Sequence, residues 1–339
     1  MEKIDFVLPW VDGQDPRWQA EKQRYMAADA GGATGDANND SRYRDFGLLR
    51  YWFRAVERFA PWVNRIFFVT CGQKPEWLDE SHAKLRLVDH RDYIPGEYLP
   101  TFHSNTIELN LHRIEDLSER FVLFNDDLFL LRPVAPDFFF RKGVPVIPCD
   151  LGIPRWLGCT NISRIALNNS GVLKQSMNVR RLIWKNIWKF VDLRSLGPVR
   201  AAKNFLSFSV NGIVIFGTFG HLAQPHLKST LGEIWSKRQG IMDTTSRSRF
   251  RRDDCVNHWL ACAWNMISGR FFPANEKRRG RFITVNKDQI GQICATIRRQ
   301  SSPQICLNDS GCGADFDLCR DEVSGALVEL LPEKSSFEK

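Results

Sequence analysis

The stretch Phe121-Val-Leu-Phe-Asn-Asp-Asp-Leu-Phe-Leu-Leu131 is an apolar run with one polar interruption, Asn125-Asp126-Asp127. Its aromatic and β-branched residues predict a buried strand. Because unpaired carboxylates are very costly to bury, we expect Asp126 and Asp127 at a strand end that opens on a cleft. Carboxylate oxygens in such a place can hold a divalent cation against an anionic substrate. A plain strand-ending turn is the alternative, since Asp and Asn favour turns, but the apolar run resumes at once.

The N-terminal half of the chain alternates strand-like apolar runs with amphipathic segments. Strands are predicted over 4–11, 65–70 and 85–89, and helices over 18–28, 48–59 and 106–114. The helix predicted over 106–114 would carry Glu108 and His112 four residues apart on one face. Alternation on this scale predicts an α/β fold with a largely parallel, Rossmann-like or GT-A-like sheet that is flanked by helices.

Acidic residues follow the predicted strands at three places. Asp12 follows the first strand, Asp126 and Asp127 interrupt the opening stretch, and Asp309 follows the apolar residues 303–307. In an open α/β sheet, ligands bind at the carboxyl ends of the strands. These carboxylates are therefore candidates for a functional site, although Asp12 taken alone is equally well explained as a turn residue.

The composition is that of a globular protein with an anionic partner. The 339 residues can form one elaborated domain over 1–339, and the hydrophobic (43%) and charged (25%) shares argue against disorder. The net charge of +8 favours a nucleotide, a nucleic acid, an anionic polymer or a membrane surface as partner. The nine cysteines include no Cys-x-x-Cys pair, which argues against a zinc ribbon. No signal peptide opens the chain, so we expect a cytoplasmic protein with reduced thiols.

Residues 150–204 form a basic, tryptophan-rich segment that is predicted to be a helical insertion in this domain. From 151 to 203 there are ten Lys or Arg residues and a single acid, Asp192. A helix predicted over 181–191 places a basic stripe beside an apolar one, namely Arg181, Lys185 and Lys189 next to Trp184, Ile187 and Trp188. Such a helix could rest on the anionic inner face of the plasma membrane. The favoured alternative is that it packs on the protein's own core and exposes a solvated basic face.

Histidines and arginines of the C-terminal half complete a set that suits phosphoryl chemistry. His221 and His226 flank a proline-containing loop, and the basic stretch 246–254 includes Arg249 and Arg251. A metal held by carboxylates can clamp phosphate oxygens, and arginine binds phosphate with a rigid fork of donors. A histidine can deprotonate an attacking hydroxyl near neutral pH. Spacing alone does not show that these residues meet in space.

Four motif regions follow one another along the chain. They are residues 4–13, the long region from 42 to 127 with Pro100-Thr-Phe-His-Ser104 and Phe124-Asn-Asp-Asp127, the region with Gln224-Pro-His226 and Arg249-Phe-Arg251, and Ile305-Cys-Leu-Asn-Asp309. With these motifs the sequence resembles the Stealth family, the hexose-1-phosphate transferases of microbial capsule synthesis, whose animal relatives include GlcNAc-1-phosphotransferase. The chain departs from the family's usual residues at Cys71, at His103 and at Ser310.

The resemblance implies a reaction and its partners. A sugar-1-phosphate, such as HexNAc-1-phosphate, would move from a UDP-sugar to a hydroxyl of a capsular oligosaccharide acceptor. A phosphodiester would form, UMP would leave, and the anomeric configuration would be retained. The resemblance also implies a bound Mg²⁺ or Mn²⁺, a role in capsular or exopolysaccharide synthesis, and no nucleic-acid partner.

The resemblance further implies roles for individual residues. The metal would be held by three aspartates, Asp126, Asp127 and Asp309. Asp12 would lie at the nucleotide-sugar pocket, and Asp12 and Asp127 would both take part in catalysis. His226 would be the general base, and Arg251 would stabilise charge on the transferring phosphoryl group. Substrate binding would be supported by Arg44, Ser104, Glu108, His112, Asn125 and Arg249.

Two other functions agree with parts of the sequence. A metal-dependent nucleotide-sugar glycosyltransferase also places clustered Asp residues after a strand, but it would release UDP and form a plain glycosidic bond. A non-catalytic protein that binds nucleic acid or a polymer through 151–203 would need no divalent metal. The second alternative leaves the Asn-Asp pairs at the strand ends unexplained.

Overall fold

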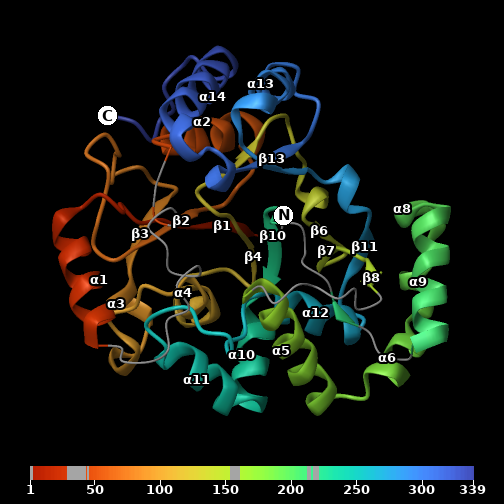
Figure 1. Ribbon diagram of the computed structural model, residues 1–339. Helices are drawn as coiled ribbons and strands as arrows, with labels where there is room; N and C mark the ends of the chain where they lie inside the picture. The colour runs from red at the N-terminus through yellow and green to blue at the C-terminus, as the bar shows by residue number, and fades with distance from the viewer. Residues whose placement is uncertain (1–2, 29–42, 44–45, 153–160, 212–214, 217–220) are drawn as a thin grey trace.

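A five-stranded sheet is the centre of the computed structural model, which describes residues 3–28, 43, 46–152, 161–211, 215–216 and 221–339. The strand order is β10-β4-β1-β2-β3, made of Gln224–Leu227, Arg120–Leu123, Ile4–Pro9, Ile66–Thr70 and Leu85–Asp89. β4, β1, β2 and β3 are parallel, and β10 is antiparallel to β4 (Figure 1). The order reverses between β1 and β4, which is where open α/β sheets bind ligands. The predicted α/β, Rossmann-like sheet is confirmed.

The buried strand predicted from Phe121 onward is confirmed as β4, and Asp126 and Asp127 lie beyond its end as predicted, but the apolar residues after them form a separate strand. β4 ends at Leu123, the chain turns through Asn125-Asp126-Asp127, and β5 (Leu128–Leu130) joins a second sheet. In that sheet β5 is antiparallel to β13 (Gln304–Asn308), which in turn is parallel to β12 (Arg281–Thr284). The two carboxylates therefore lie at a corner between two sheets, beyond the carboxyl end of β4.

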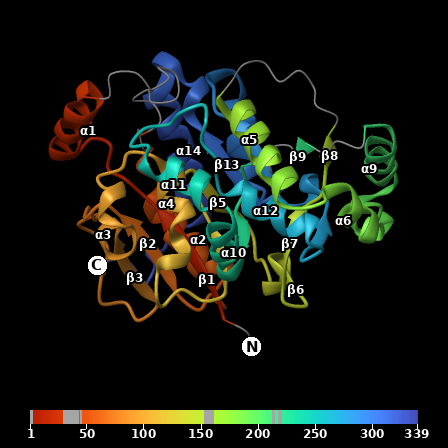
Figure 2. The same cartoon turned by 90° about the horizontal axis from the view of Figure 1, so that it is seen from below.

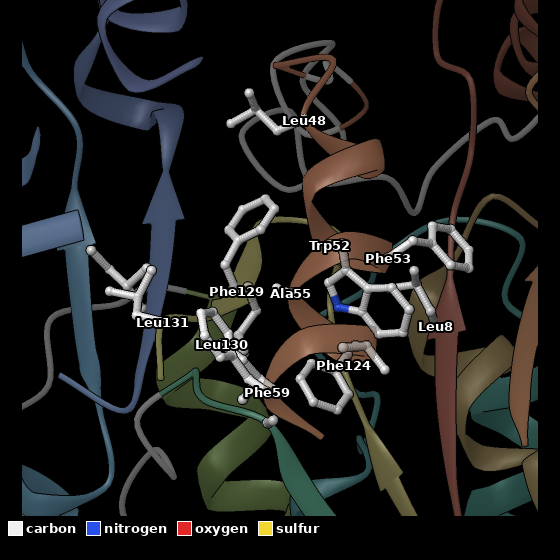
Figure 3. Packing of buried hydrophobic residues seen from close by; sticks show 14 of the residues in the cluster. Leu8, Leu48, Trp52, Phe53, Ala55, Phe59, Phe124, Phe129, Leu130 and Leu131 are labelled. Carbon is white, nitrogen blue, oxygen red and sulfur yellow. The ribbon is translucent and has the colours of Figure 1, made fainter. Parts of the chain in front are cut away.

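The two faces of the central sheet pack into separate cores, because side chains alternate along each strand. Phe6 and Leu8 of β1 belong to the core that contains α2 (Leu49–Phe59) and α14 (Phe316–Leu330). Val7 lies in the opposite core, with α10 (Lys228–Lys237) and α12 (Trp259–Ile267). In the first core the buried ring of Trp52 lies 5.4 Å from that of Phe124, next to the acidic turn (Figure 3).

Shorter elements surround this frame. A three-stranded sheet consists of β6 (Phe140–Arg141), β7 (Val144–Pro148) and β11 (Phe272–Ala274), and β8 (Leu151–Gly152) pairs with β9 (Ile215–Phe216). The remaining helices of the frame are α1 (Pro16–Ala28), α3 (His90–Tyr93), α11 (Gln239–Arg247) and α13 (Ile290–Arg298). The helices predicted over 18–28 and 48–59 are thus confirmed as α1 and α2.

The helix predicted over 106–114 is wrong in its bounds. Helix α4 runs from Ser104 to Leu109, and a separate 3-10 turn covers Leu111–Arg113. Asn110 separates them, because its buried side-chain amide donates to the Thr106 carbonyl at 2.8 Å and to Ser246 Oγ at 3.2 Å. These bonds hold the junction at the end of α4. Glu108 and His112 consequently do not share one helix face.

The basic segment is helical, but it is broken into short pieces. It contains α5 (Asn161–Ser176), α6 (Val179–Lys185), α7 (Ile187–Phe190), α8 (Leu193–Leu196) and α9 (Pro198–Asn211). The single helix predicted over 181–191 is wrong, because Asn186 interrupts it and turns its side-chain amide onto the Leu182 carbonyl at 2.9 Å. Among the helices of the described residues, none combines the length and the apolarity needed to cross a bilayer.

Candidate active site

An acidic corner, formed by Asp126, Asp127 and Asp309, lies where β4, β5 and β13 meet. The Leu307 N–H of β13 donates to the Asp127 carbonyl at 2.8 Å, and the Cys306 thiol donates to Asp127 Oδ2 at 3.3 Å. Asp309 follows β13 directly, and its charge acts on the Asp127 carboxyl. The register of β13 against β5 therefore joins acids that are far apart in the sequence.

Asp127 is the acid of the corner with an unsatisfied carboxyl oxygen. Its Oδ1 atom is buried and has no hydrogen-bond partner. Burial raises the pKa of the Asp127 carboxyl to about 6, the Cys306 hydrogen bond opposes this effect, and the charge of Asp309 adds to it. A buried carboxylate with an unpartnered oxygen and an acidic neighbour suits a hard divalent cation. Among the described residues, no group of three His, Cys, Asp or Glu side chains is arranged to hold a metal ion by itself.

Asp12 lies beyond the carboxyl end of β1, the strand next to β4. Its carboxylate accepts from the Gln14 N–H at 2.9 Å, which is the bond of a turn-forming Asp. The Gln73 side chain, which follows β2, accepts from the Asp12 N–H at 2.9 Å and donates to the Asp12 carbonyl at 3.1 Å. A Cβ at Gly13 would lie 1.9 Å from the Tyr43 carbonyl oxygen, so only glycine allows this approach. Asp12 thus stabilises the turn and also lies at the carboxyl edge of the sheet, where open α/β sheets generally bind ligands.

Helix α4 joins the arginine and histidine parts of the site. At its first residue the Ser104 hydroxyl accepts from an Arg251 Nη2–H at 2.9 Å. One turn later Glu108 Oε2 lies 2.6 Å from His258 Nδ1. Residues four apart lie on one helix face, so Ser104 and Glu108 hold the Arg251 guanidinium and the His258 imidazole on the same side of α4. Glu108 and His258 are both largely buried.

His226 lies behind this pair, on β10. Its ring stacks on Phe121 of β4 at 5.5 Å and lies 5.5 Å from the ring of His258, nearly perpendicular to it. His226 is 1% exposed, and neither of its ring nitrogens has a hydrogen-bond partner in the structure. Burial, and then the neighbouring His258, holds the pKa of His226 well below its usual value. The ring is therefore neutral at pH 7. His226 pairs with Phe121 of β4, and Phe121 is five residues before Asp126 in the sequence.

The segment that carries the arginines runs beside residues 102–104. The Phe102 N–H donates to the Arg249 carbonyl at 2.9 Å, and the rings of Phe102 and Phe250 stack at 5.3 Å. His103 Nδ1 lies 3.1 Å from the Ser248 carbonyl, so it carries the proton of that hydrogen bond. Burial, helped by the charge of Arg251, lowers the pKa of His103 to about 3. The second and third motif regions are therefore packed against each other.

Arg249 faces a different space from Arg251. Its guanidinium lies 5.0 Å from the ring centre of Tyr25, its Nη2 donates to the Leu99 carbonyl at 3.4 Å, and its buried Nε has no partner. It lines a cavity of about 440 Å³ together with Tyr25, Ala28, Thr244, Arg247, Ser248, Phe250, Arg252 and Asp254. Of the three arginines in this lining, Arg247 pairs with Asp243 and Arg252 pairs with Asp254. Arg249, whose Nε has no partner, is therefore the group of this lining that best suits a phosphate-bearing ligand.

Three remaining candidates are less closely tied to these groups. His112 Nδ1 lies 3.3 Å from the Leu109 carbonyl, its ring lies 5.9 Å from that of Trp235, and burial lowers its pKa to about 4. The Asn125 carbonyl accepts from the Leu128 N–H at 3.2 Å and closes the acidic turn. Arg44 lies outside the described residues.

Sequence reasoning missed His258 and Gln73. His258 is a lone histidine before a helix, and its sequence neighbours, Asn257 and Trp259, give no sign of a role. Only the fold brings it to Glu108, which is 150 residues earlier. Gln73 lies inside the second motif region, so its presence there was the one available signal.

Comparisons with known proteins find two conserved regions in the N-terminal half of this chain. Stealth protein CR1, conserved region 1, matches residues 2–30, and Stealth protein CR2, conserved region 2, matches residues 42–146. These matches contain Asp12, the helix α4 residues and the Asn125-Asp126-Asp127 turn. A solved galactosyltransferase, LgtC in complex with donor and acceptor sugar analogs, is 10% identical over 98% of each chain, with a TM-score of 0.35.

Curated relatives match over the full length. Capsular polysaccharide phosphotransferase WcwK of Streptococcus pneumoniae is 40% identical over 340 residues, with 100% of both chains covered. Receptor polysaccharide phosphotransferase WefC of Streptococcus oralis is 40% identical over 342 residues, again with 100% of both chains covered. Exopolysaccharide phosphotransferase cps2G of Lactiplantibacillus plantarum is 32% identical over 99% of this chain and 96% of the relative. On this identity and coverage, the chain belongs to the Stealth family of proteins.

Proposed function

We propose that this protein is a phosphotransferase of capsular or exopolysaccharide synthesis that moves a sugar-1-phosphate from a UDP-sugar to a hydroxyl of an oligosaccharide acceptor. The acceptor oxygen forms a bond to the β-phosphorus of the donor, and the bond from that phosphorus to the bridging oxygen breaks. UMP leaves with the bridging oxygen, and the acceptor proton passes to a base. The anomeric bond is untouched, so a HexNAc donor would keep its configuration.

The observation that carries the proposal is the pair of contacts made by α4. Ser104 holds Arg251 at 2.9 Å, and Glu108 holds His258 at 2.6 Å, one helical turn apart. Phosphoryl transfer needs a cation beside the phosphoryl oxygens and a base for the attacking hydroxyl. Arg251 is suited to the first task, because its donors form a fork that matches phosphate.

In this proposal the general base is one of two neighbouring histidines, His226 or His258. His226 is neutral and can accept a proton, which keeps it as the candidate indicated by the family resemblance. His258 offers a second imidazole whose Nδ1–H is oriented by the Glu108 carboxylate, so that Nε2 is the nitrogen left to take a proton. A carboxylate that orients an imidazole in this way also stabilises the charge that protonation creates.

The acidic corner fits a divalent cation in this proposal. Asp127, with its buried and unpartnered Oδ1, would hold Mg²⁺ or Mn²⁺ with Asp126 and Asp309 beside it. Such a cation would neutralise charge on the donor's phosphate oxygens. Mg²⁺ in proteins takes one or two carboxylates and completes its shell with water and substrate phosphates. Asp12 lies on the same sheet edge and is proposed to border the nucleotide-sugar.

The test of this proposal is the identity of the leaving nucleotide. The protein is incubated with Mg²⁺, a panel of UDP-sugars labelled at the β-phosphorus, and capsular oligosaccharides. Release of UMP, with the label in the oligosaccharide as a phosphodiester, is the expected result. Release of UDP with an unlabelled glycoside would show a glycosyltransferase instead and would overturn the proposal.

A further inference from the structure

Exposed apolar side chains gather on one part of the molecule. Among the described residues, seven of the eleven large hydrophobic side chains recorded as exposed lie between positions 167 and 206. Six of them lie on α6 to α9, and we call this set the α6–α9 face: Trp184, Trp188, Leu193, Val199, Phe205 and Leu206. Figures 1 and 2 show α6 and α9 at one end of the molecule, away from α1. Apolar groups that are gathered on a surface mark an interaction site.

The α6–α9 face is the outer side of helices whose inner sides are already packed. Ile183 and Phe190 are fully buried, and Leu196 is nearly so. On α9 the buried Asn204 side chain accepts from the Leu151 N–H at 2.9 Å and donates to the Phe190 carbonyl at 2.8 Å. That contact fixes which side of α9 points inward. Val199, which is 83% exposed, must then point outward.

The helices that carry these apolar groups pack on one another. α7 and α8 both pack against α9, and the Trp184 ring of α6 stacks on Phe208 of α9 at 5.9 Å. Val199 and Leu206 are seven residues apart on α9 and therefore share a stripe. Phe208 is buried and lies one turn after the inward Asn204, so Trp184 contacts the inner side of α9, whereas Val199 and Leu206 lie on its outer side. The exposed apolar groups are thus clustered on neighbouring helices at one end of the molecule.

The surroundings of this face are cationic. Arg180, Arg181, Lys185 and Arg194 are exposed, and none of them makes an ion pair with a described residue. The one acid of this segment, Asp192, accepts from the Arg194 N–H at 3.1 Å and so serves as the N-cap of α8. Free positive charge therefore borders exposed tryptophans and aliphatic side chains.

We propose that the α6–α9 face binds the surface of an anionic lipid bilayer. Tryptophan and aliphatic side chains enter the headgroup boundary, and Lys and Arg beside them pair with anionic headgroups. A second copy of the chain does not fit, since two identical cationic faces would repel each other. A nucleic acid does not fit either, because its phosphates would meet six apolar side chains. The inference rests on the proposed function only in that polysaccharide synthesis gives the protein a reason to bind a membrane. Its test needs no substrate.

The test is sedimentation of the full chain with vesicles of phosphatidylcholine, with or without phosphatidylglycerol. We expect binding to the vesicles that contain phosphatidylglycerol, and weaker binding as salt is added.

The double variant Trp188→Ser with Val199→Ser should bind about tenfold more weakly. The triple variant Arg180→Gln, Arg181→Gln and Lys185→Gln should lose the salt dependence. Leu318→Ser, on the exposed side of α14, is the matched control and should bind like the parent protein.

Each other outcome counts against the proposal. Equal sedimentation with neutral and anionic vesicles, no sedimentation with either, or full binding by the double variant would overturn it. A dimer in light scattering that the double variant abolishes would assign the face to a second copy instead. The thermal midpoint of each variant shows that it is folded. Transfer to a soluble acceptor should be unchanged in the double variant, so failure of vesicle binding and failure of the proposed transferase activity are read separately.

Discussion

The pairing of Glu108 with His258 gives a prediction at the scale of single residues. Glu108→Gln removes the charge that orients and stabilises the imidazole, and His258→Gln removes the imidazole itself. We expect each variant to lower kcat about 100-fold while KM changes little, because the loss affects the transition state. Steady-state kinetics with a UDP-sugar and an acceptor measures both constants.

His226→Ala serves as the comparison for this pair. If His226 is the base, its loss should be the most damaging of the three substitutions, and normal turnover in His226→Ala would remove it from the mechanism. If His258 is the base, the double variant Glu108→Gln with His258→Gln should be no worse than His258→Gln alone. Unchanged kcat in both single variants would refute the role that we give to the pair.

His103 gives a prediction about pH. Burial lowers the pKa of His103 to about 3 in the folded protein, while an unfolded histidine titrates near 6.5. The neutral ring therefore contributes stability that is fully present above pH 6.5 and is lost as the pH falls towards 3. The loss amounts to about 1.4 kcal/mol per pH unit for each such histidine.

The variant His103→Asn isolates this contribution. Its amide can still donate to the Ser248 carbonyl, but it does not titrate. Urea unfolding at a series of pH values should show a shallower loss of the free energy of unfolding below pH 6.5 than in the parent protein. Parallel curves would mean that His103 is protonated in the folded state. His112→Gln, which removes a half-buried histidine with a pKa of about 4, should give a change in the same direction.

At the scale of elements, α2 is the helix on which the acidic turn rests. Trp52 is fully buried, and its ring packs on those of Phe53 at 5.1 Å and Phe124 at 5.4 Å. Trp52→Ala should lower the free energy of unfolding by about 3–5 kcal/mol, because the cavity left behind cannot collapse fully. Trp52→Phe should cost less, since it also removes a buried indole N–H that has no partner. Denaturant unfolding measures both effects, and Val328→Ala on the exposed side of α14 should be nearly neutral.

Elements with purely local signals were predictable from the sequence. β1, β2 and β3 are short, largely apolar runs that end in polar or glycine residues, and α2 carries its apolar positions at helical spacing. The turn at Asn125-Asp126-Asp127 was predictable as a strand end. Its second half was not, because β5 owes its sheet to β13, which lies about 180 residues later in the chain. The break at Asn110 depends in the same way on a bond to Ser246.

The sequence identified individual residues of the site, but it did not predict which of them contact each other. Composition and motifs singled out Arg251, Ser104 and Glu108, but the Arg251–Ser104 and Glu108–His258 contacts span 147 and 150 residues. A histidine without a spacing partner, such as His258, carries no signal that distinguishes it from a core residue. The sequence also did not decide that Trp188 points outward, because an apolar stripe on a helix can face either a core or a binding surface.

At the scale of the whole molecule, metal and donor should stabilise the fold together. Mn²⁺ with UDP should raise the Tm, because both bind only to the folded chain. UDP with a chelator, or UDP and Mn²⁺ with Asp127→Asn, should give little or no rise. Differential scanning fluorimetry measures these shifts, and Leu318→Ser should respond like the parent protein. An equal rise in the presence of the chelator would show that the nucleotide binds without a metal.

The acidic corner between β4 and β13 has a consequence for folding during synthesis. The Leu307 N–H and the Cys306 thiol that hold Asp127 are supplied by β13, about 180 residues after the acidic turn, and Asp309 directly follows that strand. While the ribosome is still making the protein, the central sheet can already form, but the acids have not yet been brought together. A nascent chain that has not yet reached β13 therefore contains the central sheet but lacks the acidic corner that we propose as the metal site.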